Sequence, residues 1–170
     1  MMNAQLTGLL ETLRATRFRD LAGARMTAQV PIPERLLNDL IAGSIPPNAP
    51  VRAVTIHPSP DDHFAVRIVP KAPLLPAFTL KLAIEHQPQL PANATLGLRL
   101  VTLGGLFGLA GGMIAGFLPP GIALDGERIR VDLRSLAVQH KAAEAFEYLR
   151  GIRVNSDAGR LILHVDAAID

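Results

Sequence analysis

The chain has 170 residues and a formal net charge of +2, and 49% of it is hydrophobic although only 4% is aromatic. This length predicts one domain, residues 1–170, with an aliphatic core. The small net charge, the absence of tryptophan and the single tyrosine exclude nucleic acid as a partner, while the absence of cysteine excludes disulfides and thiolate metal sites.

The first segment predicts an amphipathic helix over residues 4–17. Asn3 can cap this helix, and four leucines form one stripe while the arginines face away from it. The start of the chain lacks the basic region and continuous apolar run of a secretory signal. We therefore expect a cytoplasmic protein, and peripheral contact with a membrane stays open.

Residues 24–30 alternate apolar and polar side chains, which predicts a half-buried strand that ends at Pro31 and Pro33. Residues 33–42 then predict a helix, because proline stands in its first turn and Gly43 follows its last. Apolar residues at helical spacing should form its inner face: Leu36, Leu37, Leu40 and Ile41.

Pairs of alternating segments predict hairpins in the middle of the chain. Residues 51–57 and 63–69 flank a turn rich in proline and aspartate, which suits a reversal of direction. Residues 78–84 and 96–100 alternate in the same way and predict two more strands.

The last third of the chain repeats this pattern around a helical region. Asp125-Gly126 between two short apolar runs is a strong hairpin signal. A helical region capped by Asp132 should run over residues 133–150, break near Gln139 and end at Gly151, before a final hairpin that turns at residues 155–159. Because the strands arrive in hairpins, we predict an antiparallel α+β fold with additional amphipathic helices.

Residues 103–118, LGGLFGLAGGMIAGFL, form the most unusual segment, because they carry no charge and repeat glycine every four residues. As a helix, this segment would be apolar all round and would need an apolar environment. Three interpretations stay open: a helix packed under a sheet, a transmembrane helix, and a helix that closes an aliphatic cavity for a lipid. The transmembrane interpretation is the weakest, because a bilayer core needs ~20 apolar residues.

If the segment closes a cavity, the glycine-rich helix and the inner strand faces would line it. This apolar pattern gives the candidate ligand-binding residues Leu103, Leu106, Phe107, Ala110, Met113, Ile114, Phe117, Leu82 and Leu98.

Catalytic motifs are absent from the sequence. The glycines never take the spacing of a dinucleotide-binding loop, and none of the four serines stands in a G-x-S-x-G context. The best metal candidate is His57 with Asp61, Asp62 and His63 around the proline-rich turn, but a third strong ligand is lacking. We therefore predict no enzyme activity, no catalytic residues, no metal and no cofactor.

Residues 118–136, LPPGIALDGERIRVDLRSL, combine an apolar-proline start, an Asp-Gly hairpin, an I-x-V-x-L strand and a helix. This pattern resembles bacterial tubular lipid-binding (TULIP-type) domains, including small phospholipid-binding proteins, and the preceding VPIPERLLNDLI segment is compatible with them. The resemblance implies a strongly curved antiparallel sheet wrapped around a helix, an apolar groove for acyl chains, and no catalytic residues.

The leading hypothesis is a non-enzymatic domain that binds or transfers a lipid or another aliphatic ligand in an apolar groove. Its partner would be a lipid or a fatty-acyl ligand. The alternative is a structural interaction module that homodimerises, or docks on a membrane, through the glycine-rich helix, since small residues four apart allow close helix packing.

Overall fold

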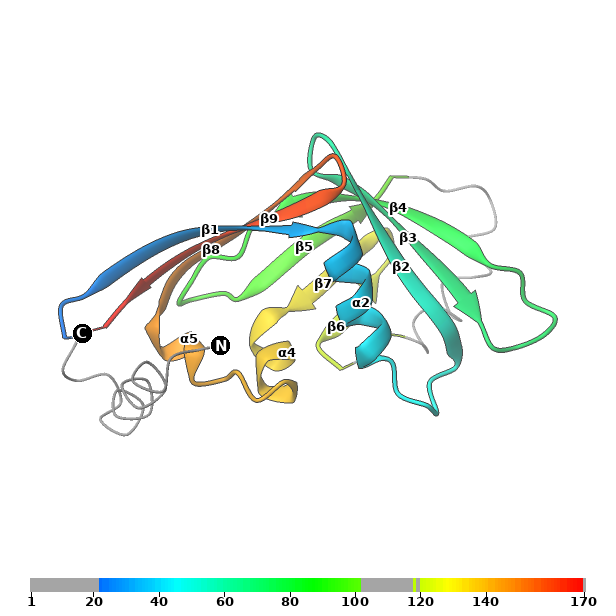
Figure 1. Ribbon diagram of the computed structural model, residues 1–170, viewed down its shortest axis with the longest axis horizontal. Coiled ribbons are helices and arrows are strands. Elements are labelled where there is room, and N and C mark those ends of the chain that lie inside the picture. Colours follow the sequence, from blue (N-terminus) through cyan, green and yellow to red (C-terminus); the bar gives the residue numbers. More distant parts are fainter. Residues whose placement is uncertain (1–21, 102–117, 119, 170) are drawn as a thin grey trace, which may run out of the picture.

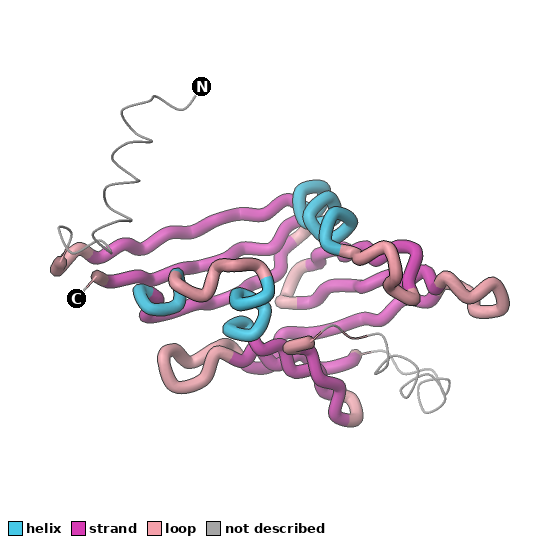
Figure 2. The backbone as a smooth tube through the Cα atoms, turned by 90° about the horizontal axis from the view of Figure 1, so that it is seen from below, coloured by secondary structure: helices cyan, strands magenta, loops and turns pink. Residues whose placement is uncertain are grey.

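The computed structural model describes residues 22–101, 118 and 120–169. In this part of the chain the strands form two antiparallel sheets with short helices beside them (Figures 1 and 2). The six-stranded sheet has the order β2-β3-β4-β5-β7-β6, and the three-stranded sheet has the order β1-β9-β8. The strands are β1 (Arg25–Pro33), β2 (Val51–Ser59), β3 (His63–Pro70), β4 (Phe78–His86), β5 (Thr95–Leu100), β6 (Ile122–Asp125), β7 (Arg128–Asp132), β8 (Leu149–Asp157) and β9 (Arg160–Ala168), and the helices are α2 (Glu34–Ser44), α4 (Leu133–Gln139) and α5 (Ala145–Tyr148).

The hairpins predicted from sequence are confirmed. β2 pairs with β3, β6 with β7, and β8 with β9, all antiparallel. Gly126 and Gly159 stand in the last two turns at φ +60° and +68°, a conformation that glycine adopts without a Cβ clash. The antiparallel sheet with a few helices is therefore correct. The helices predicted over residues 4–17 and 103–118 lie outside the described residues, apart from Leu118.

Strand β1 extends further than predicted, because it runs through Pro31 to Pro33. The prediction that these prolines end the strand is wrong. Proline cannot donate a ladder hydrogen bond, so it is tolerated where the N–H would face away from a partner strand. β1 meets this condition, since it is the edge strand of its sheet and pairs with β9 alone.

Helix α2 confirms the helix predicted over residues 33–42, except that Pro33 is its N-cap residue and does not lie in its first turn. Gly43 does not end it, because the helix continues to Ser44, whose hydroxyl donates to the Leu40 carbonyl oxygen at 2.8 Å. The predicted inner face is only partly enclosed. Leu36 and Leu40 remain 49% and 58% exposed.

The helical region after Asp132 also begins and breaks as predicted. α4 starts after Asp132 and ends at Gln139, and a separate short helix, α5, follows. The prediction that Gly151 ends this region is wrong, because β8 already begins at Leu149. Gly151 lies opposite Asp166 of β9, and a Cβ at Gly151 would stand 3.0 Å from Oδ2 of Asp166. A side chain at position 151 would therefore crowd the Asp166 side chain, which would have to move.

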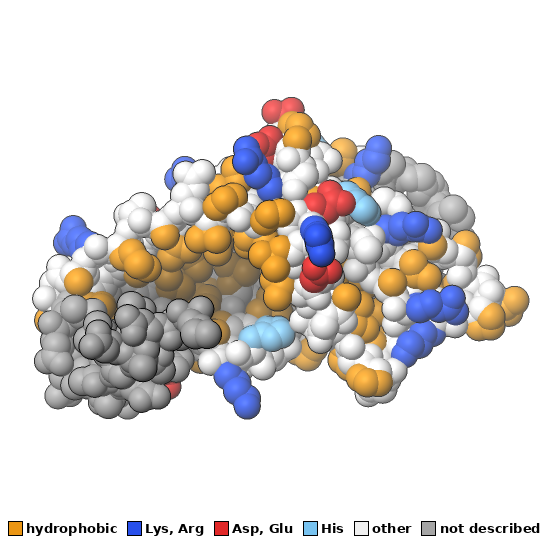
Figure 3. Space-filling model, viewed as in Figure 1, with side chains coloured by type: hydrophobic (Ala, Val, Ile, Leu, Met, Phe, Trp, Pro, Cys, Tyr) orange, Lys and Arg blue, Asp and Glu red, His pale blue; other side chains and the backbone are white. Residues whose placement is uncertain are grey.

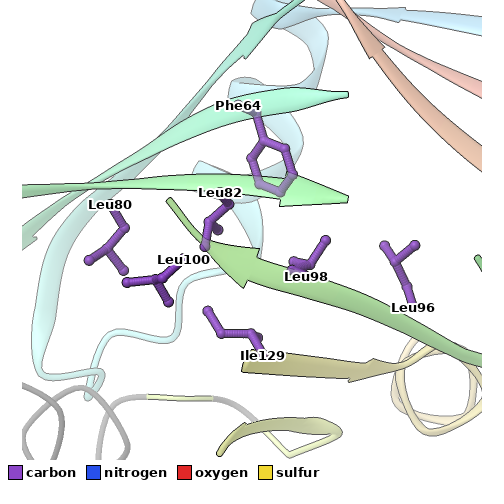
Figure 4. Packing of buried hydrophobic residues seen from close by; sticks show 7 residues of the cluster. All are labelled: Phe64, Leu80, Leu82, Leu96, Leu98, Leu100 and Ile129. Atoms are coloured by element: carbon purple, nitrogen blue, oxygen red, sulfur yellow. The ribbon is translucent and has the colours of Figure 1, made fainter. Parts of the chain in front are cut away.

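Each sheet has one apolar face and one polar face. In the six-stranded sheet, directly opposed residues share a face, and apolar residues oppose one another across the whole sheet. Figure 4 shows the resulting cluster, whose side chains project from β3, β4, β5 and β7 to one side. It contains Phe64, Leu80, Leu82, Leu96, Leu98, Leu100 and Ile129.

The two sheets are joined where the outer edge of β8 meets the ends of β3 and β4. The Gln87 side-chain amide donates to the Val154 carbonyl oxygen at 2.7 Å and accepts from the Val154 N–H at 2.9 Å. A side chain thus replaces a neighbouring strand on this edge. Val154 also packs against the apolar cluster of the six-stranded sheet, which places both apolar faces on the same side.

Asp62 and Ser156 complete this junction. One carboxylate oxygen of Asp62 accepts from the Ser156 N–H at 2.9 Å, and both accept from the Asn155 side-chain amide. Ser156, 5% exposed, is the buried polar residue of the described chain, and its hydroxyl donates to the His63 carbonyl oxygen at 2.6 Å. Unpaired polar groups at such a site are costly, so these partners fix where the two sheets meet.

The turn before β3 offers a matched test of the junction. Asp61 and Asp62 have nearly the same backbone conformation, at φ 59° and 58°, where glycine is favoured. Only the Asp62 carboxylate reaches β8 among the contacts of the described residues. We expect Asp62→Gly to be less stable than Asp61→Gly by about 2 kcal/mol, since hydrogen bonds to a charged group are lost. Urea unfolding of both variants measures the difference, and equal midpoints would show that the Asp62 carboxylate contributes nothing to the stability of the junction.

Asp132 gives a pH-dependent prediction. Its carboxylate accepts from the Ser135 hydroxyl at 2.7 Å and from the Arg134 and Ser135 N–H groups, and the Ser135 hydroxyl contact is the main reason that the pKa of Asp132 is lowered. A lowered pKa means that the ionised group stabilises the fold above about pH 4 and loses this effect as the pH falls through the folded-state pKa. We expect Asp132→Ala to cost about 1 kcal/mol at pH 7 and progressively less below pH 4 in chemical unfolding. A constant cost down to pH 2 would contradict the assignment.

Candidate functional site

The apolar face of the three-stranded sheet is the principal candidate site. The register places its apolar side chains opposite one another in rows, as in Met26–Ala167–Leu149 and Val30–Leu163–Val154. We call this surface the apolar trough. It consists of Met26, Ala28, Val30, Ile32, Leu149, Ile152, Val154, Leu161, Leu163, Val165 and Ala167.

The trough is much less covered than the apolar face of the six-stranded sheet. None of its residues is buried by the described part of the chain, and Met26 and Val30 are 58% and 44% exposed. By contrast, the cluster around Leu100 is almost closed to solvent, with Leu100 at 2%. In Figure 3 the molecule is hollowed beside β1 and α2, and hydrophobic side chains line the hollow. Through Val154, the trough continues into the packed cluster of the other sheet.

The structure places two of the residues predicted to line a cavity. Leu82 and Leu98 lie on the inner face of β4 and β5, where they are 4% and 6% exposed and belong to the packed cluster. The other seven lie outside the described residues: Leu103, Leu106, Phe107, Ala110, Met113, Ile114 and Phe117.

The residues of the candidate metal site have separate partners. His57 Nδ1 lies 2.8 Å from Glu34 Oε1, His63 Nδ1 lies 2.6 Å from the Asp61 carbonyl oxygen, and Asp62 is bound to Asn155 and Ser156. Within the described ranges, no group of three or more potential ligands is arranged to hold a metal ion.

The polar faces of the two sheets border a second, open cleft of about 1070 Å³. Arginines line it from β7 and β8, together with Glu85 and Asp166. Arg99 and Arg128 oppose each other across β5 and β7, and Glu85 lies 3.8 Å and 3.3 Å from them. Because Arg99 and Arg128 are largely exposed, this arrangement is a solvated network of ion pairs, in which each pair contributes little.

Sequence reasoning missed the strands of the three-stranded sheet as a site. The alternation in residues 24–30 and in the last hairpin is visible in the sequence, but nothing local indicates that β1 pairs with β9. The signal that was available is the composition of these strands, whose alternate positions are apolar over their full length.

The described helices are all too short or too polar to cross a membrane. Comparison of the chain with protein-family models, with curated proteins and with solved structures gives no match.

Proposed function

We propose that this protein binds a lipid, or another ligand with a fatty-acyl chain, in the apolar trough and carries it without catalysing a reaction. The observation that carries the proposal is the partly exposed apolar face of the three-stranded sheet, with Met26 and Val30 the most exposed, backed by a polar face on its other side. Large exposed apolar surfaces of this kind are typical of binding sites rather than of solvated sheet faces.

The size and chemistry of the trough suit an acyl chain. Its strands are nine residues long, which corresponds to about 30 Å at about 3.4 Å per residue. Its side chains are aliphatic, and the chain as a whole has few aromatic residues. Each CH2 group removed from water contributes about 0.8 kcal/mol, so a tail lying along the trough gains affinity without any polar contact.

The proposal extends to the tubular lipid-binding architecture that the sequence resembles. In that arrangement the curved sheet would wrap around the glycine-rich segment, and residues such as Phe107 and Met113 would complete the lining over Leu82 and Leu98. The order of hairpins and helices is compatible with it.

Adjacent positions on β1 test the trough directly. Val30 belongs to the trough, whereas Gln29 lies on the opposite, polar face of the same strand and is also exposed. We expect Val30→Glu to weaken binding of a fluorescent fatty-acyl probe by roughly tenfold or more, because a carboxylate must then lose water against the tail. Gln29→Glu should bind like the unmodified protein.

Circular dichroism and thermal unfolding of both variants check that the sheet is intact. Equal probe affinity in the two folded variants would place the ligand elsewhere, and no saturable binding by the unmodified protein would reject the proposed function.

A further inference from the structure

Two proline-rich loops, residues 45–50 and 71–77, form an apolar tip at the end of the molecule where β3 connects to β4. Leu74, between Pro73 and Pro76 in sequence, is 94% exposed, and no other large hydrophobic residue of the described chain is so exposed. In Figure 1 this loop projects beyond the sheet at the right-hand end. An isolated leucine at such a position has no packing role within the described part of the fold.

The second loop, residues 45–50, is held against the first. The Lys71 N–H donates to the Pro50 carbonyl oxygen at 2.9 Å, and the Lys71 ammonium group donates to the Pro47 carbonyl oxygen. Within the projecting loop, the Leu75 N–H donates to the Ala72 carbonyl oxygen at 3.1 Å. Prolines and these hydrogen bonds restrict the conformations of both loops, so Leu74 stands on a loop of defined shape.

Basic side chains lie at the base of the tip, on the strands and loop that lead to it. Residues 40–60 and 63–84 contain no aspartate or glutamate, and Arg52, Arg67 and Lys71 stand within four residues of the two loops in sequence. Lys81 opposes Ala65 and lies nearer the other end of the hairpin. Arg52 and Lys71 line one small pocket of about 300 Å³ together with Pro46 and Pro47. The acids of the β2–β3 hairpin, Asp61 and Asp62, lie in its turn at the opposite end. Figure 3 shows Lys and Arg side chains gathered near the apolar tip on this face.

We propose that this tip docks on an anionic lipid bilayer, with Leu74 inserted among the acyl chains and the basic side chains against the headgroups. An apolar tip with basic side chains at its base matches the two layers of an anionic bilayer surface, where negative charge lies directly above hydrocarbon. The proposal rests on the proposed function for its purpose, since a lipid carrier must reach a membrane to load or deliver its ligand.

The absence of tryptophan from the chain gives a direct test. In Leu74→Trp the new indole is the single tryptophan, and in the control Val138→Trp it replaces a residue of α4 that is 60% exposed. With vesicles of phosphatidylcholine and phosphatidylglycerol, we expect a blue shift and quenching by brominated acyl chains for Leu74→Trp alone. The same response in both variants, or none in Leu74→Trp, overturns the proposal. Self-association of the Leu74→Trp variant without a response to vesicles would assign the tip to a protein contact and would also overturn it.

A second pair of variants separates position from total charge. Arg52→Glu with Arg67→Glu should weaken sedimentation with the anionic vesicles by roughly tenfold or more. Arg25→Glu with Arg153→Glu changes the net charge equally but lies on the three-stranded sheet, and it should bind nearly as the unmodified protein does. Equal losses in both double variants, or equal binding to vesicles of phosphatidylcholine alone, contradict the docking surface.

The fatty-acyl titration distinguishes this proposal from the proposed function. Arg52→Glu with Arg67→Glu should lose vesicle binding and keep acyl binding, because these substitutions change the tip and leave the trough intact. If the unmodified protein docks on vesicles but does not bind the acyl probe, docking through the tip stands and the proposed carrier function is rejected.

Discussion

The structure depends on the hydrogen bonds that fasten the outer edge of β8 to the six-stranded sheet. An exposed strand edge carries unpaired N–H and C=O groups, and here Gln87 and Asp62 supply their partners from side chains. On the free edge of β2, in the six-stranded sheet, the side-chain amide of Asn38 from α2 likewise pairs with the N–H and C=O groups of Ile56. Because these contacts fix the angle between the sheets, they also fix the apolar trough that lies on one side of the junction.

The arrangement separates two kinds of surface. Apolar faces of both sheets lie on the same side and meet at Val154, whereas the reverse side carries the ion pairs around Glu85. The packed cluster around Leu100 supplies hydrophobic stabilisation, so the trough on the three-stranded sheet can stay partly open. The packed cluster and the trough are thus two parts of one continuous apolar surface, and the exposed Leu74 belongs to neither.

Local patterns predicted most strands, because alternation and turn residues act over few residues, as in the hairpins at Gly126 and Gly159. These local patterns gave wrong predictions where contacts with distant parts of the chain determine the structure. Pro31 is compatible with a strand because β1 is an edge, and Gly151 lies within β8, where a side chain would crowd that of Asp166 on β9. Neither relation is visible in the local sequence. The trough could not be predicted, since β1 and β9 are far apart in the sequence and the Gln87–Val154 pairing uses a side chain in place of a strand. The lining predicted over residues 103–117 lies outside the described residues.

Native mass spectrometry of the protein purified from cells, followed by organic extraction, tests the central claim most directly. We predict a stoichiometric adduct that extracts as a phospholipid or a fatty acid and that disappears in Val30→Glu but not in Gln29→Glu. A clean mass without adduct, as monomer or dimer, in protein that also fails to take up added lipid would contradict it. In that case the exposed apolar face would belong to a protein interface.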